Sequence, residues 1–465
     1  MAKKYGVFPE MTTSNGATVF GQEYGRSSQW VLMGELAEYG RRRTVQFDVS
    51  KEKVISIVGR RGQGKSYTLG AIVEGLCTAH DSPLSAVKRD RAVILFDPLN
   101  IFQWTYIPLS QADNDSHEMK QQRQLLSGWD LEPVPLNVQV WVPAGYRSPQ
   151  YPARYKDLYL GVADFTLDDW AALTGFDVVR DIMGQYLSAL YHKVAKLGWE
   201  DSEGSRHLPK ERYSIQDLIT CSMNSGDEEK MFFREDTIRA VRQRLSSYAA
   251  HPIFSGQGTP LTDILRAGTL SIVLLNRLPE DLRTVLVAAL ARRIVAERAE
   301  ASETMKDVLL NTALSQGERE AKQKAVAAAI PKTWVVIDEI QTILPADTRT
   351  AATDALIKLI KEGRNFGLSF MGTTQQPRAV HATAMSQTET FFIHRLVSQG
   401  DIECVMANLK SPSPDEIKDE NRALKLQDLI RELPVGYVAV SDSNTPRAFV
   451  MAVRPRISAH GGFEA

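Results

Sequence analysis

One stretch decides the fold: Val54-Ile55-Ser56-Ile57-Val58-Gly59-Arg60-Arg61-Gly62-Gln63-Gly64-Lys65-Ser66. It begins with mostly apolar, β-branched residues typical of a buried strand, and these lead into a loop of the pattern G-x-x-x-x-G-K-S. The segment that follows, from Tyr67 to Cys77, has the pattern of a helix. A strand, this loop and a helix in succession are the context in which the pattern binds phosphate. A chance match on an ordinary strand–turn–helix is the alternative, and the complete motif with both flanks disfavours it.

The residue types of this loop suit a triphosphate. Glycines allow the backbone to approach phosphates closely, and backbone N–H groups together with the helix N-terminus face the negative charge. We expect Lys65 to reach the β- and γ-phosphates of ATP and Ser66 to hold Mg²⁺. The predicted nucleotide-binding residues are Gly59, Gly62, Gln63, Gly64, Lys65, Ser66 and Tyr67.

A second stretch, Trp334-Val335-Val336-Ile337-Asp338-Glu339, supplies what hydrolysis needs beyond binding. The apolar run predicts a strand that delivers two carboxylates at its C-terminal end, where ligands bind in open α/β sheets. Asp338 is expected to hold Mg²⁺ through water, and Glu339 to activate the attacking water. An apolar run followed by Asp-Glu is common, so solvated carboxylates at a strand end are the alternative. The complete P-loop favours the functional interpretation, and the lack of an L-S-G-G-Q signature disfavours a transport-type cassette.

Two further stretches complete the predicted site. The apolar run 368–372 is followed by Thr373-Thr374-Gln375-Gln376-Pro377, and an amide at such a strand tip, Gln375, can sense the γ-phosphate or orient water. A turn capped by Pro377 is the alternative there. Arg364 precedes this strand, and its planar guanidinium suits transition-state charge as a finger from a neighbouring subunit. The alternative is a surface arginine at a helix end, which the helix dipole favours.

Other charged residues have weaker claims. Lys53, just before the P-loop strand, is an equal choice between a further cation of the site and a solvated lysine. His394 follows an apolar strand, and we expect a hydrogen-bonded structural histidine there rather than a catalytic one. The helix face with Arg239, Arg242 and Arg244 is expected to be solvated or ion-paired, with DNA contact as the minor alternative.

Length and composition limit the class of protein. The chain has 465 residues, which predicts two or three structural units. Hydrophobic content of 43% and a formal net charge of −1 are ordinary for a soluble protein, and they leave room for a basic pore in a ring. The three scattered cysteines have no metal or redox spacing, so we expect a reducing cytoplasm. No run approaches the ~18–20 apolar residues that span a bilayer, and no signal-peptide pattern begins the chain, so we expect no membrane association.

The order of apolar runs predicts an α/β protein: a RecA-like P-loop core with a mainly parallel sheet, an inserted helical subdomain and a small N-terminal β appendage. We place a β-rich, half-barrel-like region at 1–50 and the first part of the core at 51–150. The helical insertion is placed at 151–255, with 199–211 as a loop. The second part of the core follows at 256–465, interrupted by an exposed helical excursion or mobile loop at 303–330. The predicted core strands are 54–58, 92–98, 138–143, 269–275, 334–337, 368–372, 391–393 and 436–440.

These motifs, in this order, resemble the HerA/FtsK superfamily of ring ATPases, and the HerA branch is the most similar. The segment Glu362-Gly363-Arg364-Asn365-Phe366-Gly367, Asp97-Pro98 and the tail ending His460-Gly461-Gly462 also look similar to that branch. By this resemblance, the glycines of the loop with Lys65 and Ser66 correspond to Walker A, Asp338 and Glu339 to Walker B, Gln375 to the sensor glutamine and Arg364 to the trans-acting finger. The chain departs from the family at Arg60 and Arg61, where small or polar residues are frequent, and at Lys53, where many members have arginine.

The resemblance implies a homohexamer with ATP sites between subunits and a central channel that passes DNA by phosphate contacts. It also implies a separately encoded partner, either a nuclease or an effector of anti-phage defence. The main hypothesis is therefore an ATP-driven DNA translocase or helicase subunit that works with such a partner. The second is a ring scaffold that uses ATP to assemble and regulate a toxic or nuclease effector without moving DNA. A third, the DNA-pumping or secretion branch, is disfavoured because its coupling proteins usually carry membrane segments.

Overall fold

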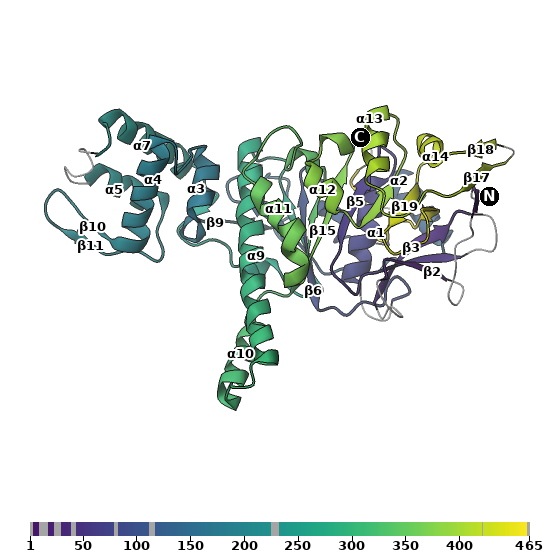
Figure 1. Cartoon of the computed structure of the whole chain (residues 1–465), viewed down its shortest axis with the longest axis horizontal. Helices are drawn as coiled ribbons and strands as arrows, with labels where there is room; N and C mark the ends of the chain where they lie inside the picture. The colour runs from purple at the N-terminus through teal and green to yellow at the C-terminus, as the bar shows by residue number, and fades with distance from the viewer. Residues whose placement is uncertain are drawn as a thin grey trace.

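The computed structural model describes residues 3–8, 17–22, 29–38, 43–78, 82–110, 117–224, 232–420 and 422–462. Within these residues one sheet of thirteen strands forms the centre of the molecule (Figure 1). Its strands, in spatial order, are β2 (Ala17–Phe20), β4 (Thr44–Asp48), β3 (Trp30–Leu36), β20 (Phe449–Val453), β19 (Tyr437–Asp442), β16 (Thr390–Ile393), β5 (Val54–Val58), β15 (Leu368–Thr374), β14 (Lys332–Ile337), β6 (Arg91–Asp97), β13 (Leu270–Leu274), β7 (Val138–Pro143) and β8 (Lys156–Leu158).

The sheet is parallel from β16 to β8, as the apolar runs predict. Successive side chains of a strand point to opposite faces, and the two faces have separate cores. In β14, Val335 and Ile337 join one core, while Trp334 and Val336 join the other. Fully apolar strands are therefore required, because helices cover both faces.

The helices fall on the two faces as follows. The P-loop helix α1 (Lys65–Cys77) packs its Leu69, Ile72 and Val73 into one core. On the other face lie α9 (Glu280–Leu310) and α11 (Thr353–Glu362), whose apolar residues join the second core. The remaining core helices are α2 (His117–Ser127), α8 (Leu261–Ile264), α12 (Ala382–Gln387), α13 (Gln399–Ala407) and α14 (Leu426–Glu432).

The N-terminal region is β-rich, as expected, but its described strands do not form the expected half-barrel. β3 pairs antiparallel with β20, so β2, β3 and β4 extend the central sheet. Their inward side chains share the core with α1, which is the burial that fixes them to this edge; these side chains are Phe20, Val31, Met33, Val45 and Phe47. A small separate sheet, β1 (Gly6–Phe8), β17 (Glu416–Asp419) and β18 (Arg422–Leu424), lies beside it.

Helices follow β8, at one end of the sheet (Figure 1): α3 (Leu167–Thr174), α4 (Ile182–His192), α5 (Ile215–Asn224) and α7 (Glu235–Ala249). The prediction of a loop over 199–211 is wrong in part, since β10 (Trp199–Glu200) and β11 (Arg206–His207) form a hairpin there. Asp201 organises the turn by accepting hydrogen bonds from the N–H groups of Glu203 and Ser205. The rings of Trp199 and His207 stack across it at 4.0 Å.

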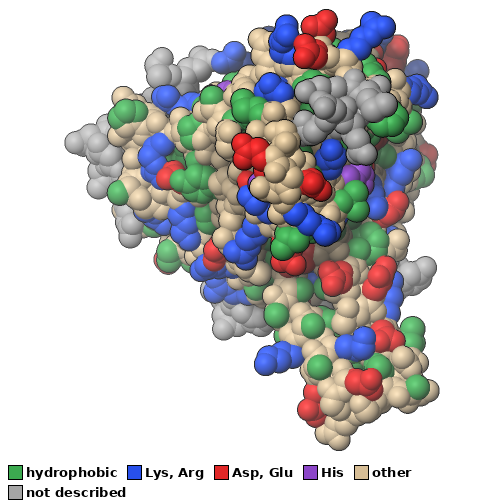
Figure 2. Space-filling view, turned by 90° about the vertical axis from the view of Figure 1, so that its left-hand side faces the viewer, with side chains coloured by type: hydrophobic (Ala, Val, Ile, Leu, Met, Phe, Trp, Pro, Cys, Tyr) green, Lys and Arg blue, Asp and Glu red, His purple; other side chains and the backbone are tan. Residues whose placement is uncertain are grey.

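The face of this helical region mixes basic, acidic and apolar side chains (Figure 2). The three arginines of α7 have partners within the chain. Arg239 pairs with Asp236, Arg242 donates to the Ser222 carbonyl at 2.6 Å, and Arg244 lies over the ring of Phe176. These contacts agree with the expectation of a solvated, ion-paired face.

The stretch 303–330 is helical. It holds the end of α9 and all of α10 (Gln316–Ala328), which together project from the body of the molecule (Figure 1). Ser315 and Glu318 form a capping box at the start of α10. None of the described helices combines the length and the apolar character needed to cross a bilayer.

Candidate active site

The loop between β5 and α1 is shaped by its glycines. A Cβ atom on Gly59 would lie 2.5 Å from Cβ of His394, so only glycine fits beside that residue. Gly64 has φ 101°, a conformation that favours glycine, and it is the N-cap of α1 without a side-chain cap. The first N–H groups of a helix have no intrahelical partner, so they are available to an anion at this end of α1.

Lys65 is the cation of this site. Its side chain is buried, and Nζ donates to the carbonyl oxygen of Arg60 at 3.2 Å. Burial lowers the pKa of Lys65, against the opposing attraction of Glu339 and Asp338. Arg60 and Arg61, in contrast, are exposed. The ammonium group of Lys65 therefore lies near both the P-loop backbone and the carboxylates of Asp338 and Glu339.

His394, directly after β16, packs against the P-loop at Gly59. Its Nε2 shares a hydrogen bond with Oγ1 of Thr68 at 2.9 Å. Burial, together with the nearby Lys65, lowers the pKa of His394 to about 3, so the ring is neutral. The prediction of a hydrogen-bonded histidine is confirmed.

Asp338 lies at the C-terminal end of β14 and has one satisfied oxygen. Thr373 Oγ1 donates to Oδ1 at 2.5 Å, and the same Oγ1 accepts from the N–H of Glu339 at 3.0 Å. Oδ2 is buried and has no partner among the described residues. Burial raises the pKa of Asp338 to about 7, and Asp97 and Glu339 add to this effect. An orphaned, buried carboxylate oxygen of this kind fits a hard divalent cation, which prefers oxygen ligands.

Asp97, at the end of the neighbouring strand β6, has the opposite surroundings. Its carboxylate accepts hydrogen bonds from the N–H groups of Leu99, Ile101 and Phe102, at 3.1, 3.2 and 2.7 Å. Burial nevertheless raises its pKa to about 6. Asp97 thus organises the loop after β6 and stands beside Asp338, a role that the Asp97-Pro98 resemblance did not specify.

Glu339 is held by two amides. Nε2 of Gln375 donates to Oε1 at 2.6 Å, and Nε2 of Gln341 donates to Oε2 at 2.6 Å. The backbone of Glu339 has φ 50° and ψ 54°, a left-handed conformation that is unfavourable for a residue with a Cβ. Gln341 was not predicted, because only the 3₁₀ turn η4 (Ile340–Thr342) brings it back to Glu339.

Two candidate cations lie elsewhere. Arg364 is exposed in η5 (Gly363–Phe366), ahead of β15, and pairs with Glu389 at 3.5 Å. The P-loop and the two carboxylates lie at the C-terminal ends of their strands, whereas Arg364 precedes the N-terminal end of β15. Arg364 is therefore one strand length away, roughly 20 Å, from the site of its own subunit. Lys53 is buried at the start of β5 and donates from Nζ to the Gly21 carbonyl at 2.6 Å. It is neither solvated nor part of the site.

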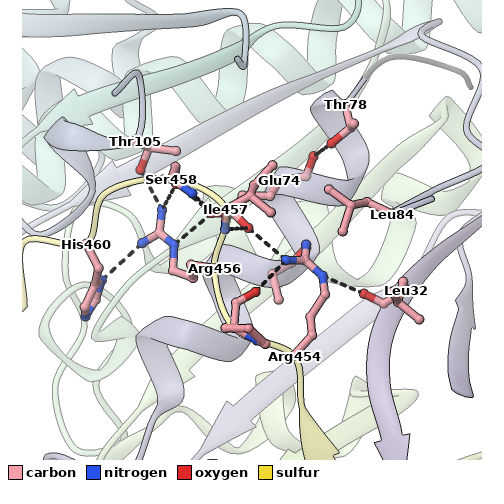
Figure 3. Close-up of polar contacts among 12 residues, drawn as sticks. Leu32, Glu74, Thr78, Leu84, Thr105, Arg454, Arg456, Ile457, Ser458 and His460 are labelled. Carbon is pink, nitrogen blue, oxygen red and sulfur yellow. Dashed lines mark hydrogen bonds and ion pairs between the residues drawn. The ribbon is translucent and has the colours of Figure 1, made fainter. Parts of the chain in front are cut away.

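The C-terminal tail is packed along α1 (Figure 3). Glu74, inside α1, is fully buried and pairs with Arg454 and Arg456, each at 3.0 Å. Ser458 donates to Glu74 from both its N–H and its hydroxyl, and Arg456 contacts Nδ1 of His460 at 3.1 Å. Burial alone would raise the pKa of Glu74, but the two guanidinium groups hold it below its usual range.

This tail cluster, comprising Glu74, Arg454, Arg456, Ser458 and His460, reaches the predicted nucleotide residues at Tyr67. The rings of Tyr67 and His460 meet edge to face at 4.5 Å. A Cβ atom on Gly70 would lie 2.5 Å from Nε of Arg456, so the guanidinium occupies the space that glycine leaves. The tail therefore fixes the position of the helix that follows the P-loop.

Comparison with known proteins agrees with this geometry. The family described as "Helicase HerA, central domain" matches residues 32–294, more than half of the chain. The chain belongs to this family. It is 23% identical over 295 residues to the DNA double-strand break repair helicase HerA of Pyrococcus furiosus, covering 58% of this chain and 53% of the relative. It is 21% identical over 232 residues to HerA of Sulfurisphaera tokodaii, covering 47% and 42%. The chain thus spans about half the length of these curated relatives.

Similar solved structures include VirB4 of Thermoanaerobacter pseudethanolicus, at a TM-score of 0.49 and 12% identity, covering 93% of this chain and 98% of that one. Another is the plasmid coupling protein TrwB in complex with ADP and Mg²⁺, at a TM-score of 0.46 and 13% identity, covering 88% and 87%. The HerA family match and the strand–loop–helix geometry make the chain a P-loop ATPase with a RecA-like α/β core.

Proposed function

We propose that the chain is a subunit of an ATP-hydrolysing ring motor that moves DNA. One observation carries this proposal: Lys65, Asp338, Glu339 and Gln375 meet at the C-terminal ends of adjacent strands, while Arg364 lies at the other end of the sheet. A cation that cannot reach its own site can complete the site of a neighbour, and a head-to-tail contact of that kind forms a ring when the rotation between subunits closes. The names of the HerA relatives support DNA as the polymer on which the ring acts.

The residues of the site have distinct tasks in hydrolysis. Backbone N–H groups of residues 62–66 and Lys65 bind the β- and γ-phosphates of ATP. Ser66 and the orphaned Oδ2 of Asp338 would hold Mg²⁺, which neutralises phosphate charge when bound. Glu339 accepts the proton of the water that attacks the γ-phosphorus, as the bond from phosphorus to the bridging oxygen breaks. Gln375, in contact with Glu339, orients the water and senses the γ-phosphate.

The ring is proposed to be a homohexamer with DNA in its channel, working with a separately encoded nuclease or anti-phage effector. Purified protein should show ATP hydrolysis that DNA stimulates, and ATP with Mg²⁺ should shift its mass in solution to a multiple of the 51.8 kDa subunit. A protein that stays monomeric and does not respond to DNA would refute the motor.

A ring scaffold is the second candidate, because two of its expected properties are the same: ATP binding and self-assembly. The feature in its favour is the reduced N-terminal region, because its described strands belong to the core sheet and do not form a unit of their own. Single-molecule tracking on DNA separates the two functions. A motor moves along DNA when ATP is added, whereas a scaffold hydrolyses ATP in place.

A further inference from the structure

The proposed catalytic base is restrained in this structure. Both carboxylate oxygens of Glu339 accept a short hydrogen bond, from Gln375 and from Gln341. Bonds from two amides to one carboxylate fix the direction in which its lone pairs point. A general base must instead turn a lone pair toward the water it deprotonates. The Gln375 contact belongs to the site described above, whereas Gln341 has no part in phosphate binding.

The Gln341 contact is held at a cost. Its Oε1 is buried and has no partner among the described residues. Turning the amide over would set that oxygen against the Glu339 carboxylate, so the contact itself dictates the orientation. A buried amide oxygen without a donor is destabilising, and so is the left-handed backbone of Glu339. Because of these two unfavourable features, a small conformational change can break the hydrogen bond between Gln341 and Glu339.

The segment that follows Gln341 connects it to an exposed stretch of the chain. The segment after η4 is hydrogen-bonded to the segment after Gln375: the N–H of Ala346 donates to Ala379 at 2.8 Å, and the N–H of His381 donates to Leu344 at 3.1 Å. The first segment continues into residues 346–349, which are exposed. A displacement of this exposed stretch would therefore move the backbones of both glutamines that hold Glu339.

We infer that Gln341 is a positioning residue that restrains Glu339 in the resting subunit and that DNA binding releases it. This inference rests on the proposed function, because it concerns the base of the same hydrolytic site. Gln341 lowers turnover in the absence of DNA and leaves ATP affinity unchanged. The restraint accounts for part of the stimulation by DNA.

The test is steady-state ATP hydrolysis by the purified full chain, with and without DNA. Gln341→Met keeps the length of the side chain and removes the donor and the unpaired oxygen; Gln341→Asn keeps the amide but cannot reach Glu339. Both should raise kcat without DNA about tenfold, the effect of one charge-assisted hydrogen bond on an equilibrium. KM for ATP should stay the same, and the ratio of stimulated to basal kcat should fall by the same factor.

The matched control is Gln316→Met, because Gln316 makes the same kind of contact with Glu320 on the exposed helix α10. It should behave as wild type. A merely structural role of Gln341 would lower the melting temperature and kcat together, which would overturn the inference. Unchanged basal kcat in both variants of an active, folded protein would overturn it alone, whereas a wild type without ATP turnover would overturn the proposed function as well.

Discussion

Two buried clusters of charge lie against α1, the P-loop site at its N-terminal end and the tail cluster along its length, and they differ in how completely their atoms are paired. In the tail cluster, both oxygens of Glu74 accept hydrogen bonds from arginine, serine and backbone donors, and no side-chain atom of Glu74, Arg454 or Arg456 is left without a partner. In the P-loop site, Asp338 Oδ2 and Gln341 Oε1 are buried without partners. The fully paired tail cluster holds α1 and the C-terminal tail together, whereas the unpaired Oδ2 of Asp338 in the P-loop site suits a ligand.

The largest effect should come from Glu339→Gln. The substitution keeps the shape and removes the proton acceptor, so ATP turnover should fall by about 10²–10⁴-fold. Nucleotide affinity and the melting temperature should stay close to wild type, because Glu339 does not bind phosphate in this scheme. Turnover within tenfold of wild type would show that another group is the base.

Glu74→Ala should unfold the tail cluster. It leaves two buried guanidinium groups without their carboxylate, which typically costs about 3–5 kcal/mol of unfolding free energy. Denaturant titration measures the loss. Glu432→Ala is the control, because it removes an exposed ion pair with Arg422 that should contribute under about 1 kcal/mol. Equal losses in the two variants would contradict the comparison.

Asp338→Asn should do the reverse of Glu74→Ala and stabilise the nucleotide-free protein. Removing a buried charge whose Oδ2 is unpaired should raise the unfolding free energy by about 2 kcal/mol at pH 7.5. Turnover should be lost, since the metal ligand is gone. In Asp97→Asn, the NH₂ group of the new amide would face backbone N–H groups that donate hydrogen bonds to the Asp97 carboxylate. That variant should therefore be less stable than wild type. If both variants were less stable than wild type, the conclusion that Oδ2 of Asp338 is unpaired in the folded protein would be contradicted.

A smaller effect concerns pH. The pKa of Asp338 in the folded protein, about 7, lies above that of an unfolded aspartate, so the folded state binds the proton more tightly. The stability of the nucleotide-free wild type should therefore rise as pH falls from about 7 toward 5, by about 1–2 kcal/mol from this group. Because Asp338→Asn lacks the group, its advantage over wild type should shrink across the same range. A constant difference between pH 7 and 5 would contradict the raised pKa.

The sequence predicted the parts of the molecule that depend on local patterns. The P-loop between Gly59 and Ser66, the strand before Asp338 and the position of Gln375 follow from residue type and spacing within short stretches. The Glu74 cluster does not, because it joins Glu74 to Arg454 and Arg456 across about 380 residues of the sequence. Pairing of β3 with β20 is similarly long-range, which is why the N-terminal strands were expected to form a unit of their own. Gln341 escaped prediction because a turn, and not a strand, brings its amide to Glu339.

Whether the hydrolytic site is shared between subunits can be tested by mixing two inactive variants. Lys65→Ala destroys the P-loop site and keeps Arg364, while Arg364→Ala keeps the P-loop site and lacks the finger. If Arg364 acts on the neighbouring subunit, each variant alone is inactive, and an equal mixture regains about a quarter of the wild-type ATP turnover, because that share of the interfaces combines an intact P-loop with an intact arginine. Turnover no greater than the sum of the separate variants would contradict a site built from two subunits.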